Sequence, residues 1–155
     1  MPISTKTIVL EDNFDAVRNA VTGDMLMDVA KAGGFVIEGH AKINASKGGK
    51  THLNVRTGAL VNSIEVSEKE KKDTSAEVGV GTNIVYGRIH EVGGIITPVN
   101  ASKLSWIGKD GTRVFAGSVH IPARPYLRPA LDENEDDIVV AVKTELQRNL
   151  DEATK

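Results

Sequence analysis

The four histidines are the residues best suited to acid–base chemistry or metal binding, and their spacing argues against both. They are His40, His52, His90 and His120. No two of them lie four positions apart, and only His90 has an adjacent carboxylate, Glu91. A metal or general-base site needs several such groups converging on one point. Because the chain also contains no cysteine, thiolate chemistry and disulfides are excluded.

Nucleophilic catalysis and phosphate binding find equally little support. No serine lies in a Gly-x-Ser-x-Gly turn. Residues 79–83 resemble part of a phosphate-binding loop, but no Gly-Lys-Ser/Thr follows, so we interpret them as a turn at the end of a strand. The acids at positions 135–137 would point in different directions on a helix, which favours a solvated face. We therefore predict no catalytic residue, no metal site and no cofactor.

The strongest charge signal is a basic stretch over residues 42–56, in which no Asp or Glu occurs. Its residues that can carry positive charge are Lys42, Lys47, Lys50, His52 and Arg56. Such charges could follow a phosphate backbone without reading its sequence, so a nucleic-acid-binding or nuclease module stays open as an alternative. The stretch has no aromatic residue on which bases could stack. We therefore favour a flexible, solvated loop over residues 45–56.

Two other segments contain residues typical of binding surfaces. Residues 56–64 lead from the basic stretch into a predicted strand, and Thr57 or Gly58 can start a turn of helix there. Residues 121–131 form a strip that prolines hold extended. The strip carries an aromatic residue and two arginines, Arg124, Tyr126 and Arg128. These types are enriched in interaction hot spots, although a strap across the chain's own sheet would explain them equally well.

Hydrophobic periodicity predicts the elements that position these residues. Apolar residues three and four apart predict a helix over 24–44, with Asp24 as N-cap, and a terminal helix from Pro129 to about 149. Alternating residues predict two strands joined by a charged turn over 68–75. Further strands are predicted over 95–97 and 113–119, with a turn at residues 108–111.

Together these elements predict an α+β fold in a single domain over residues 1–155. An antiparallel sheet of about four strands would pack against the long early helix and the long C-terminal helix. Residues 1–12 would form an N-terminal arm or edge strand, and residues 95–117 an insertion. The adjacent pair Gly33 and Gly34 weakens the early helix, so we expect it to serve close packing or a bend.

Composition limits the classes of partner. The 155 residues are 40% hydrophobic and 26% charged, with a net charge of −2, which is typical of a globular domain. A chain so close to neutral is not expected to be a bulk binder of nucleic acid or of membrane surfaces. No apolar run approaches the ~18 residues that span a bilayer, so no membrane partner is expected.

Four segments read together resemble one family. They are residues 56–64, with Thr-Gly-x-Leu-x-x-Ser-Ile, then residues 78–83, 86–94 and 122–131. Their order is similar to that of the tail-component (tail-completion, head–tail joining) family of long-tailed bacteriophages, over roughly residues 24–150. Three positions depart from the family pattern. Gly87 stands where alanine is usual, and Val92 and Tyr126 stand where phenylalanine is usual.

The resemblance implies a structural virion protein and not an enzyme. It implies a homo-oligomeric ring, with a hexamer favoured, at the head-proximal end of the tail, where it joins or terminates the tail tube at the neck. The implied partners are the tail tube protein, the neck or connector proteins, and genomic DNA that passes through the lumen without sequence-specific binding. The protein would lie in the virion tail or neck, and in the host cytoplasm during assembly.

The same resemblance identifies candidate interface residues. The predicted subunit or partner interface is Arg56, Thr57, Gly58, Leu60, Tyr86, His90, Glu91, Arg124, Tyr126 and Arg128. A loop facing the DNA lumen or a neighbouring subunit would carry Lys42, Lys47, Lys50 and His52. We expect residues 45–55 of this loop to become ordered only on assembly. The five acids within residues 132–137 could pair with the basic stretch of a neighbour.

Overall fold

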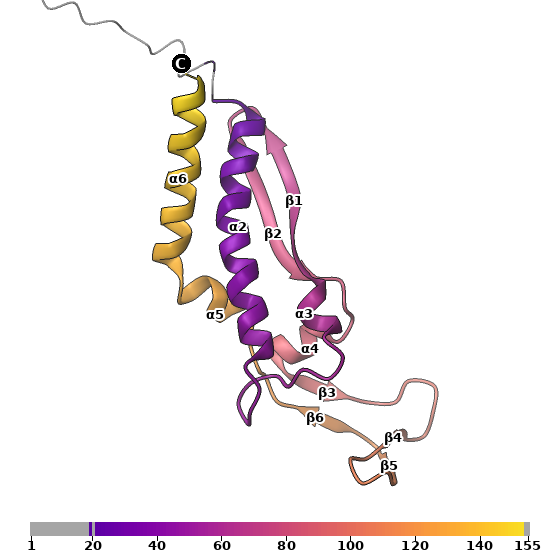
Figure 1. Ribbon diagram of the computed structural model, residues 1–155. Coiled ribbons are helices and arrows are strands. Elements are labelled where there is room, and N and C mark those ends of the chain that lie inside the picture. The colour runs from indigo at the N-terminus through magenta and orange to yellow at the C-terminus, as the bar shows by residue number, and fades with distance from the viewer. Residues whose placement is uncertain (1–18, 20, 154–155) are drawn as a thin grey trace, which may run out of the picture.

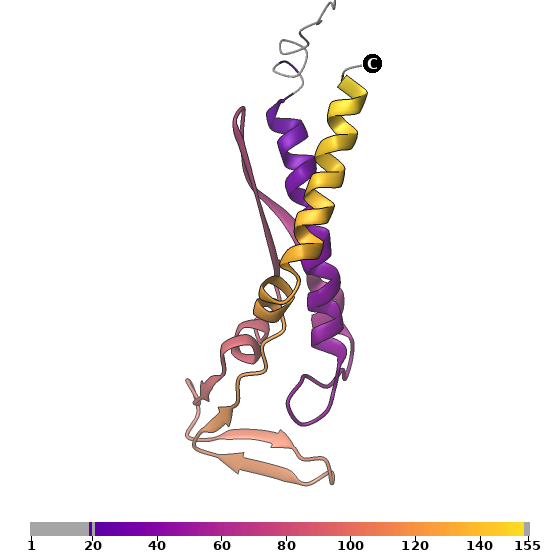
Figure 2. The same ribbon diagram turned by 90° about the vertical axis from the view of Figure 1, so that its left-hand side faces the viewer.

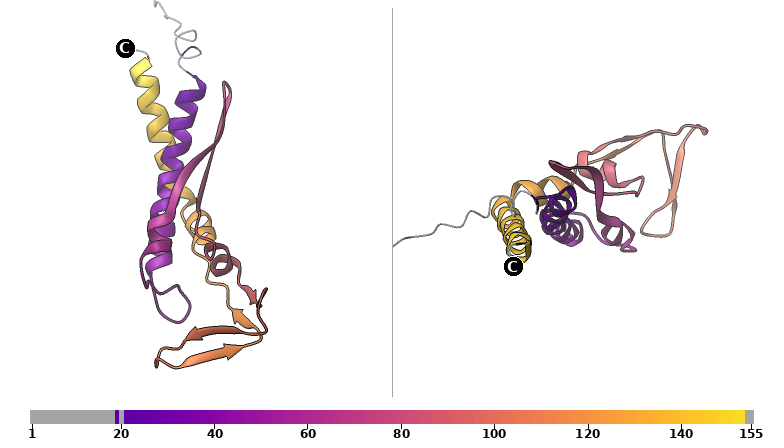
Figure 3. Two further views of the ribbon diagram at one scale, coloured as in Figure 1. Left: turned by 90° about the vertical axis from the view of Figure 1, so that its right-hand side faces the viewer. Right: turned by 90° about the horizontal axis from the view of Figure 1, so that it is seen from above.

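One long helix, α2 (Gly23–Ser46), forms the spine of the protein. The computed structural model describes Asn19 and residues 21–153, so the predicted arm at residues 1–12 lies outside the described part. A β-hairpin of β1 (Ile64–Lys72) and β2 (Ser75–Thr82) packs on one side of α2, and α6 (Glu135–Ala153) packs on the other (Figure 1). The upper part of the molecule therefore has three layers (Figure 3).

The N-cap of α2 is Thr22, and the prediction of Asp24 was wrong. The Thr22 Oγ1 accepts a hydrogen bond from the Met25 backbone N–H at 3.3 Å, which satisfies one of the free donors at the helix start. The Asp24 carboxylate instead accepts from Lys71 Nζ at 2.6 Å. At its other end α2 continues to Ser46, so the loop that follows begins two residues later than predicted.

The glycine pair of α2 serves close packing on both sides of the helix. A Cβ at Gly33 would lie 3.0 Å from Val142 Cγ2 on α6. A Cβ at Gly34 would lie 3.0 Å and 3.2 Å from the two Val66 methyl groups on β1. These two residues therefore let α6 and the hairpin approach the helix backbone more closely than alanine would allow.

Alanine should have opposite effects on stability at two glycines of α2. Gly39 is exposed and its Cβ would meet nothing within 4 Å, so Gly39→Ala should raise the free energy of unfolding by about 1 kcal/mol through helix propensity. Gly34→Ala should lower it by about 1–2 kcal/mol through overpacking. Urea denaturation of both variants checks this. A Gly34→Ala protein as stable as Gly39→Ala would show that the hairpin simply moves away.

The charged residues predicted as a turn belong mostly to the strands. β1 runs to Lys72 and β2 begins at Ser75, so only two residues form the turn. Ion pairs between α2 and β1 help the two strands to stay paired up to this turn. Lys31 Nζ lies 2.6 Å from a Glu68 oxygen, in addition to the Lys71–Asp24 contact. A bulge between Glu68 and Glu70 shifts the register within this charged part.

The α+β class is confirmed, but a single sheet of about four strands was wrong. The described residues form three separate two-stranded antiparallel sheets. The second pairs β3 (Gly94–Ile96) with β6 (Val119–Ile121), and the third pairs β4 (Leu104–Ile107) with β5 (Arg113–Ala116). Figure 2 shows both projecting below the helices. Within the described part of the chain, these strands pair only with each other and do not extend the first sheet.

The terminal helix was predicted as one element, and the structure divides it into two. α5 (Leu127–Asp132) precedes α6, and Pro129 is the third residue of α5 and not the first helical residue. Pro129 is tolerated there because the N–H groups of a first helical turn have no partner within the helix. Glu133 and Asn134 separate the helices, and Asn134 connects them through hydrogen bonds. Its Nδ2 donates to the Ala130 carbonyl at 3.0 Å, and its own carbonyl accepts from Ile138 N–H at 3.1 Å.

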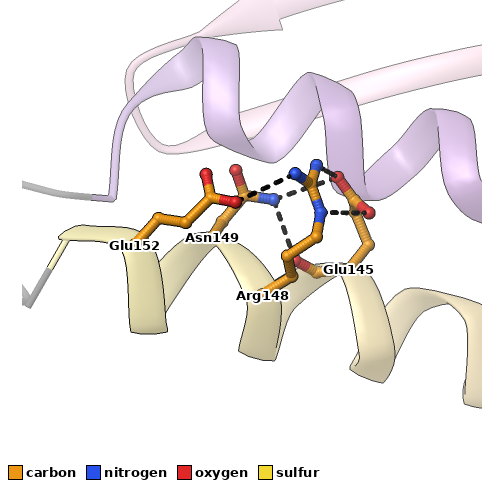
Figure 4. Close-up of polar contacts among 4 residues, drawn as sticks. All are labelled: Glu145, Arg148, Asn149 and Glu152. Carbon is orange, nitrogen blue, oxygen red and sulfur yellow. Dashed lines mark hydrogen bonds and ion pairs between the residues drawn. The ribbon is translucent and has the colours of Figure 1, made fainter. Parts of the chain in front are cut away.

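Polar side chains near the end of α6 form a network within that helix. Arg148 pairs with Glu145 and with Glu152, the latter at 3.2 Å, and Asn149 donates to the Glu145 carbonyl at 2.8 Å. Figure 4 shows these side chains pointing toward α2. No helix in the described part of the chain is long and apolar enough to span a membrane.

The hydrophobic core lies at the lower end of α2, where α5 and β1 meet it. Its buried residues are Ala41, Ala45, Leu53, Ile64, Tyr126 and Ala130. Leu53 comes from the loop after α2, and Tyr126 from the strip before α5. The core therefore joins the two segments that the sequence marked as candidate binding surfaces.

Candidate interaction surface

The Thr-Gly-x-Leu-x-x-Ser-Ile segment forms a tight corner between the basic loop and β1. Gly58 adopts the left-handed conformation with φ of 74° and precedes α3 (Ala59–Ser63), a backbone conformation that favours glycine. The Ser63 hydroxyl donates to the Leu60 carbonyl at 2.8 Å and lies 2.5 Å from Thr82 Oγ1. The corner is thus tied to the end of β2, which fixes where α3 presents its side chains.

Glu91 holds the start of α5 through three backbone hydrogen bonds. It lies on α4 (Gly87–Val92). Its Oε2 accepts from the N–H groups of Tyr126 and Leu127 at 2.7 and 2.9 Å, and its Oε1 accepts from Arg128 N–H at 2.9 Å. These donors have no partner within a helix start. The carboxylate of this predicted interface residue therefore already has partners within its own chain.

Tyr126 fills the core with a hydroxyl that finds no hydrogen-bond partner in the described part of the chain. The residue is 1% exposed. Burial, with a smaller contribution from Glu91, raises the pKa of Tyr126 to about 12. A Cβ at Gly87 would lie 3.0 Å from this hydroxyl and 2.5 Å from Thr82 Cγ2. The glycine at position 87 therefore leaves room for the Tyr126 hydroxyl.

A groove of about 1150 Å³ lies next to these contacts. It is bounded by α3, by α4, by the β4–β5 hairpin and by the loop that follows α2. We call it the basic groove. Seven of the predicted interface residues line it: Arg56, Thr57, Gly58, Leu60, Tyr86, His90 and Arg124. They come from three segments far apart in the sequence. The structure thus brings most of the predicted interface into one surface.

The other predicted site residues lie elsewhere. Glu91, Tyr126 and Arg128 do not line the groove, and neither do the four candidate loop residues Lys42, Lys47, Lys50 and His52. The Lys42 ammonium lies 2.6 Å from Glu38 on the same helix. Their proposed contacts with a neighbour or with DNA stay predictions.

The loop after α2 is anchored within its own chain. Gly48 N–H donates to the Leu53 carbonyl at 2.9 Å, and the Asn54 side chain exchanges hydrogen bonds with the Gly49 backbone at 3.1 and 3.3 Å. Leu53 is buried in the core. The loop therefore presents Val55 and Arg56 to the groove from a fixed base.

The groove combines positive charge with apolar surface. Arg56, Lys109 and Arg124 line it, and none of its lining residues is an Asp or Glu. Burial, followed by the nearby Arg124 charge, lowers the pKa of His90, so its imidazole is neutral at pH 7. The His90 ring meets the Tyr86 ring edge-on at a centroid distance of 5.8 Å. In the described part of the chain no three His, Asp or Glu residues are placed to hold a metal ion. With cations, aromatic rings and apolar side chains side by side, this surface is suited to binding another molecule.

A comparison with protein families matches residues 9–93 to the family described as "Bacteriophage HK97-gp10, putative tail-component". The match covers more than half of the 155 residues. The chain belongs to this family. The predicted resemblance is thereby confirmed. Searches of curated proteins and of solved structures gave no match.

Membership of the HK97-gp10 family makes the protein a bacteriophage tail component. This implies a place in the virion and contact with other tail or neck proteins. The matched residues include α2, the first hairpin and α4, but not the β3–β6 segments or the last two helices. The resemblance over residues 94–150 therefore stays a prediction.

The sequence did not predict the wall of the groove that β4 and the following turn form. Trp106, Ile107 and Lys109 form its far wall, yet β4 was not predicted, because its four residues are too few for periodicity to identify. The single tryptophan of the chain was the one available signal. Val55 was also missed, since an isolated valine in a loop carries no pattern.

Proposed function

We propose that this chain forms a closed ring of identical subunits at the head-proximal end of the phage tail. The ring would join or terminate the tail tube at the neck, with a hexamer as the favoured state. Its partners would be the tail tube protein on one side and neck or connector proteins on the other. Genomic DNA would pass through the lumen without sequence-specific contacts. In this role the protein is structural and not an enzyme.

The observation that carries the proposal is the uncovered apolar surface of the segment from β3 to β6. Six large hydrophobic residues there are exposed: Ile95, Ile96, Val99, Trp106, Ile107 and Phe115. An isolated two-stranded sheet is only marginally stable in water, and contiguous exposed apolar patches mark interaction sites. This segment is therefore suited to being covered by other proteins in an assembly.

The arrangement of the elements supports a ring in particular. In a ring each subunit uses two different faces, one toward each neighbour. Seen from above, α6 lies at one end of the molecule and the β4–β5 hairpin at the opposite end, with α2 between them (Figure 3). The two ends offer different surfaces: α6 begins with three acids, and the β4–β5 hairpin exposes Trp106, Ile107 and Phe115.

Virions produced without this chain test the proposal. Negative-stain images should show filled heads and separate tails, or tails of irregular length, and the full-length chain supplied in trans should restore joined particles. A control deletion of an unrelated non-structural phage protein should leave joined particles intact. Normal heads carrying normal tails in the absence of the chain would refute the proposed role.

A further inference from the structure

We propose that the basic groove binds the acidic corner of a second copy of this chain. The acidic corner is Leu131 together with Asp132, Glu133, Glu135, Asp136 and Asp137, at the junction of α5 and α6. The proposal rests on the proposed ring and names the contact that would build it. It also adds residues that the sequence did not connect, above all Lys109, Arg124 and Leu131.

The groove offers three cations without carboxylate partners. Within the described chain, Arg56, Lys109 and Arg124 form no ion pair, and no acid lines the surface around them. Beside them stand apolar side chains that are half exposed, Val55 at 51% and Ile107 at 58%. A volume of about 1150 Å³ exceeds that of typical small-molecule sites. The groove is therefore suited to a turn of polypeptide that carries acids around an apolar residue.

The acidic corner has that chemistry. Its five acids line one hollow together with Asn134, and they directly follow Leu131, a leucine that is 51% exposed. Among the described residues, only Asp137 has a basic neighbour, with His40 Nε2 at 3.7 Å from its Oδ2. The break at Asn134 turns the chain between the two helices, so the corner forms a bend at the side of the molecule (Figure 1). Leu131 would enter the apolar part of the groove, and the carboxylates would meet the three cations.

In one molecule the groove and the acidic corner are separate surfaces with no lining residue in common. We therefore place the contact between copies. Each copy would use its corner toward one neighbour and its groove toward the other, which is the heterologous contact of a ring. Opposite charges would also direct the encounter and fix its register.

Nucleic acid fits the groove less well. Affinity for DNA depends on many phosphate contacts, and the groove supplies three cations among mostly apolar or neutral residues. The loop lysines Lys47 and Lys50 do not line it. A second copy satisfies both the charges and the apolar wall.

A disulfide test is favourable because the natural chain has no cysteine. A full-length chain with Leu131→Cys and Ile107→Cys is supplied in place of the parent and oxidised, both after purification and in assembled particles. Particles should yield a ladder of covalent multimers that ends at the ring. Each single-cysteine variant should give no ladder, since the contact brings position 131 to position 107. The control pair Leu131→Cys with Asp73→Cys, at the tip of the first hairpin, should also give none.

Two outcomes of this experiment would overturn the inference. One is the absence of multimers in particles that contain the doubly substituted chain. The other is a covalent product with a different tail protein. Because these particles already contain the chain, either result would contradict the inferred contact but not the proposed ring. Normal particles formed without the chain would contradict both the contact and the ring.

Charge reversal provides a second, independent test. One full-length variant carries Arg56→Glu and Lys109→Glu, and the other carries Glu133→Lys and Asp136→Lys. Each variant alone should lower the yield of joined particles by about tenfold or more, while co-expression restores it, because a reversed corner matches a reversed groove. Glu77→Lys, an exposed strand position, is the control and should have no effect. Failure of co-expression to restore assembly of folded variants would contradict the inference. So would a loss of salt-sensitive DNA binding by the groove variant without any effect on assembly.

Discussion

Replacing Glu91 with alanine is expected to lower the free energy of unfolding by about 3 kcal/mol. Its carboxylate accepts three backbone hydrogen bonds at the start of α5, from Tyr126, Leu127 and Arg128. Hydrogen bonds to a charged group contribute about 1.5–3 kcal/mol each at most, and part of the loss is recovered when water reaches the freed donors. The loss of a helix cap alone costs about 1 kcal/mol. Urea denaturation followed by circular dichroism measures the difference.

Two matched variants make the Glu91 prediction specific. Glu91→Gln retains the shape and one acceptor oxygen, so it should cost about half as much as alanine. Glu77→Gln removes an exposed carboxylate in β2 and should change the free energy of unfolding by less than about 0.5 kcal/mol. If Glu91→Ala were as stable as the parent, Glu91 would not hold α5. Glu91 would then have to contact a partner protein instead.

Gly87→Ala is expected to lower the free energy of unfolding by about 2–3 kcal/mol. The added Cβ would lie 2.5 Å from Thr82 Cγ2 and 3.0 Å from the Tyr126 hydroxyl. Thr82 cannot easily turn away, because its hydroxyl also accepts from Ile84 N–H at 3.0 Å and contacts Ser63. Overpacking of this kind typically costs 1–3 kcal/mol. The same urea denaturation measures the effect.

A double-mutant cycle with Tyr126→Phe separates the two contacts of that methyl group. Tyr126→Phe alone should be neutral or stabilise by up to about 1 kcal/mol, because it removes a buried hydroxyl that has no partner in the described residues. In that background Gly87→Ala should cost about 1 kcal/mol less than in the parent. An equal cost in both backgrounds would show that the Thr82 methyl alone excludes alanine.

These predictions distinguish two uses of the four sequence motifs. Gly58, Glu91 and Tyr126 act within the chain, as a left-handed corner, a helix cap and a core residue. Arg56 and Arg124 come from the same motifs but point their charge into the basic groove. We infer that the motif backbone and core residues build the groove, and that the arginines make it selective for acidic partners.

The proposed contact also gives a reason for the uneven charge distribution in a chain whose net charge is only −2. The acids of residues 132–137 line one surface, and the groove cations, which have no ion pair within the described residues, line a separate one. Within a single subunit these opposite charges do not attract each other directly. In the proposed ring they would attract each other at every subunit boundary.

The sequence alone determined the elements whose patterns are local. The periodicity of residues 24–44 predicted α2, and the alternation around residues 64 and 80 predicted the first hairpin. The ordered motifs identified the family. These features depend on neighbours within a few positions, so side-chain type and spacing suffice to reveal them.

Only the tertiary structure decided what depends on distant neighbours. It placed Trp106 and Lys109 opposite Arg56, set the Glu91 carboxylate on the start of α5, and brought Gly87 against Tyr126. It also divided the predicted sheet into three, because strand partners are chosen by packing and turn geometry over the whole chain. The basic groove belongs to this class, since its walls come from segments far apart in the sequence.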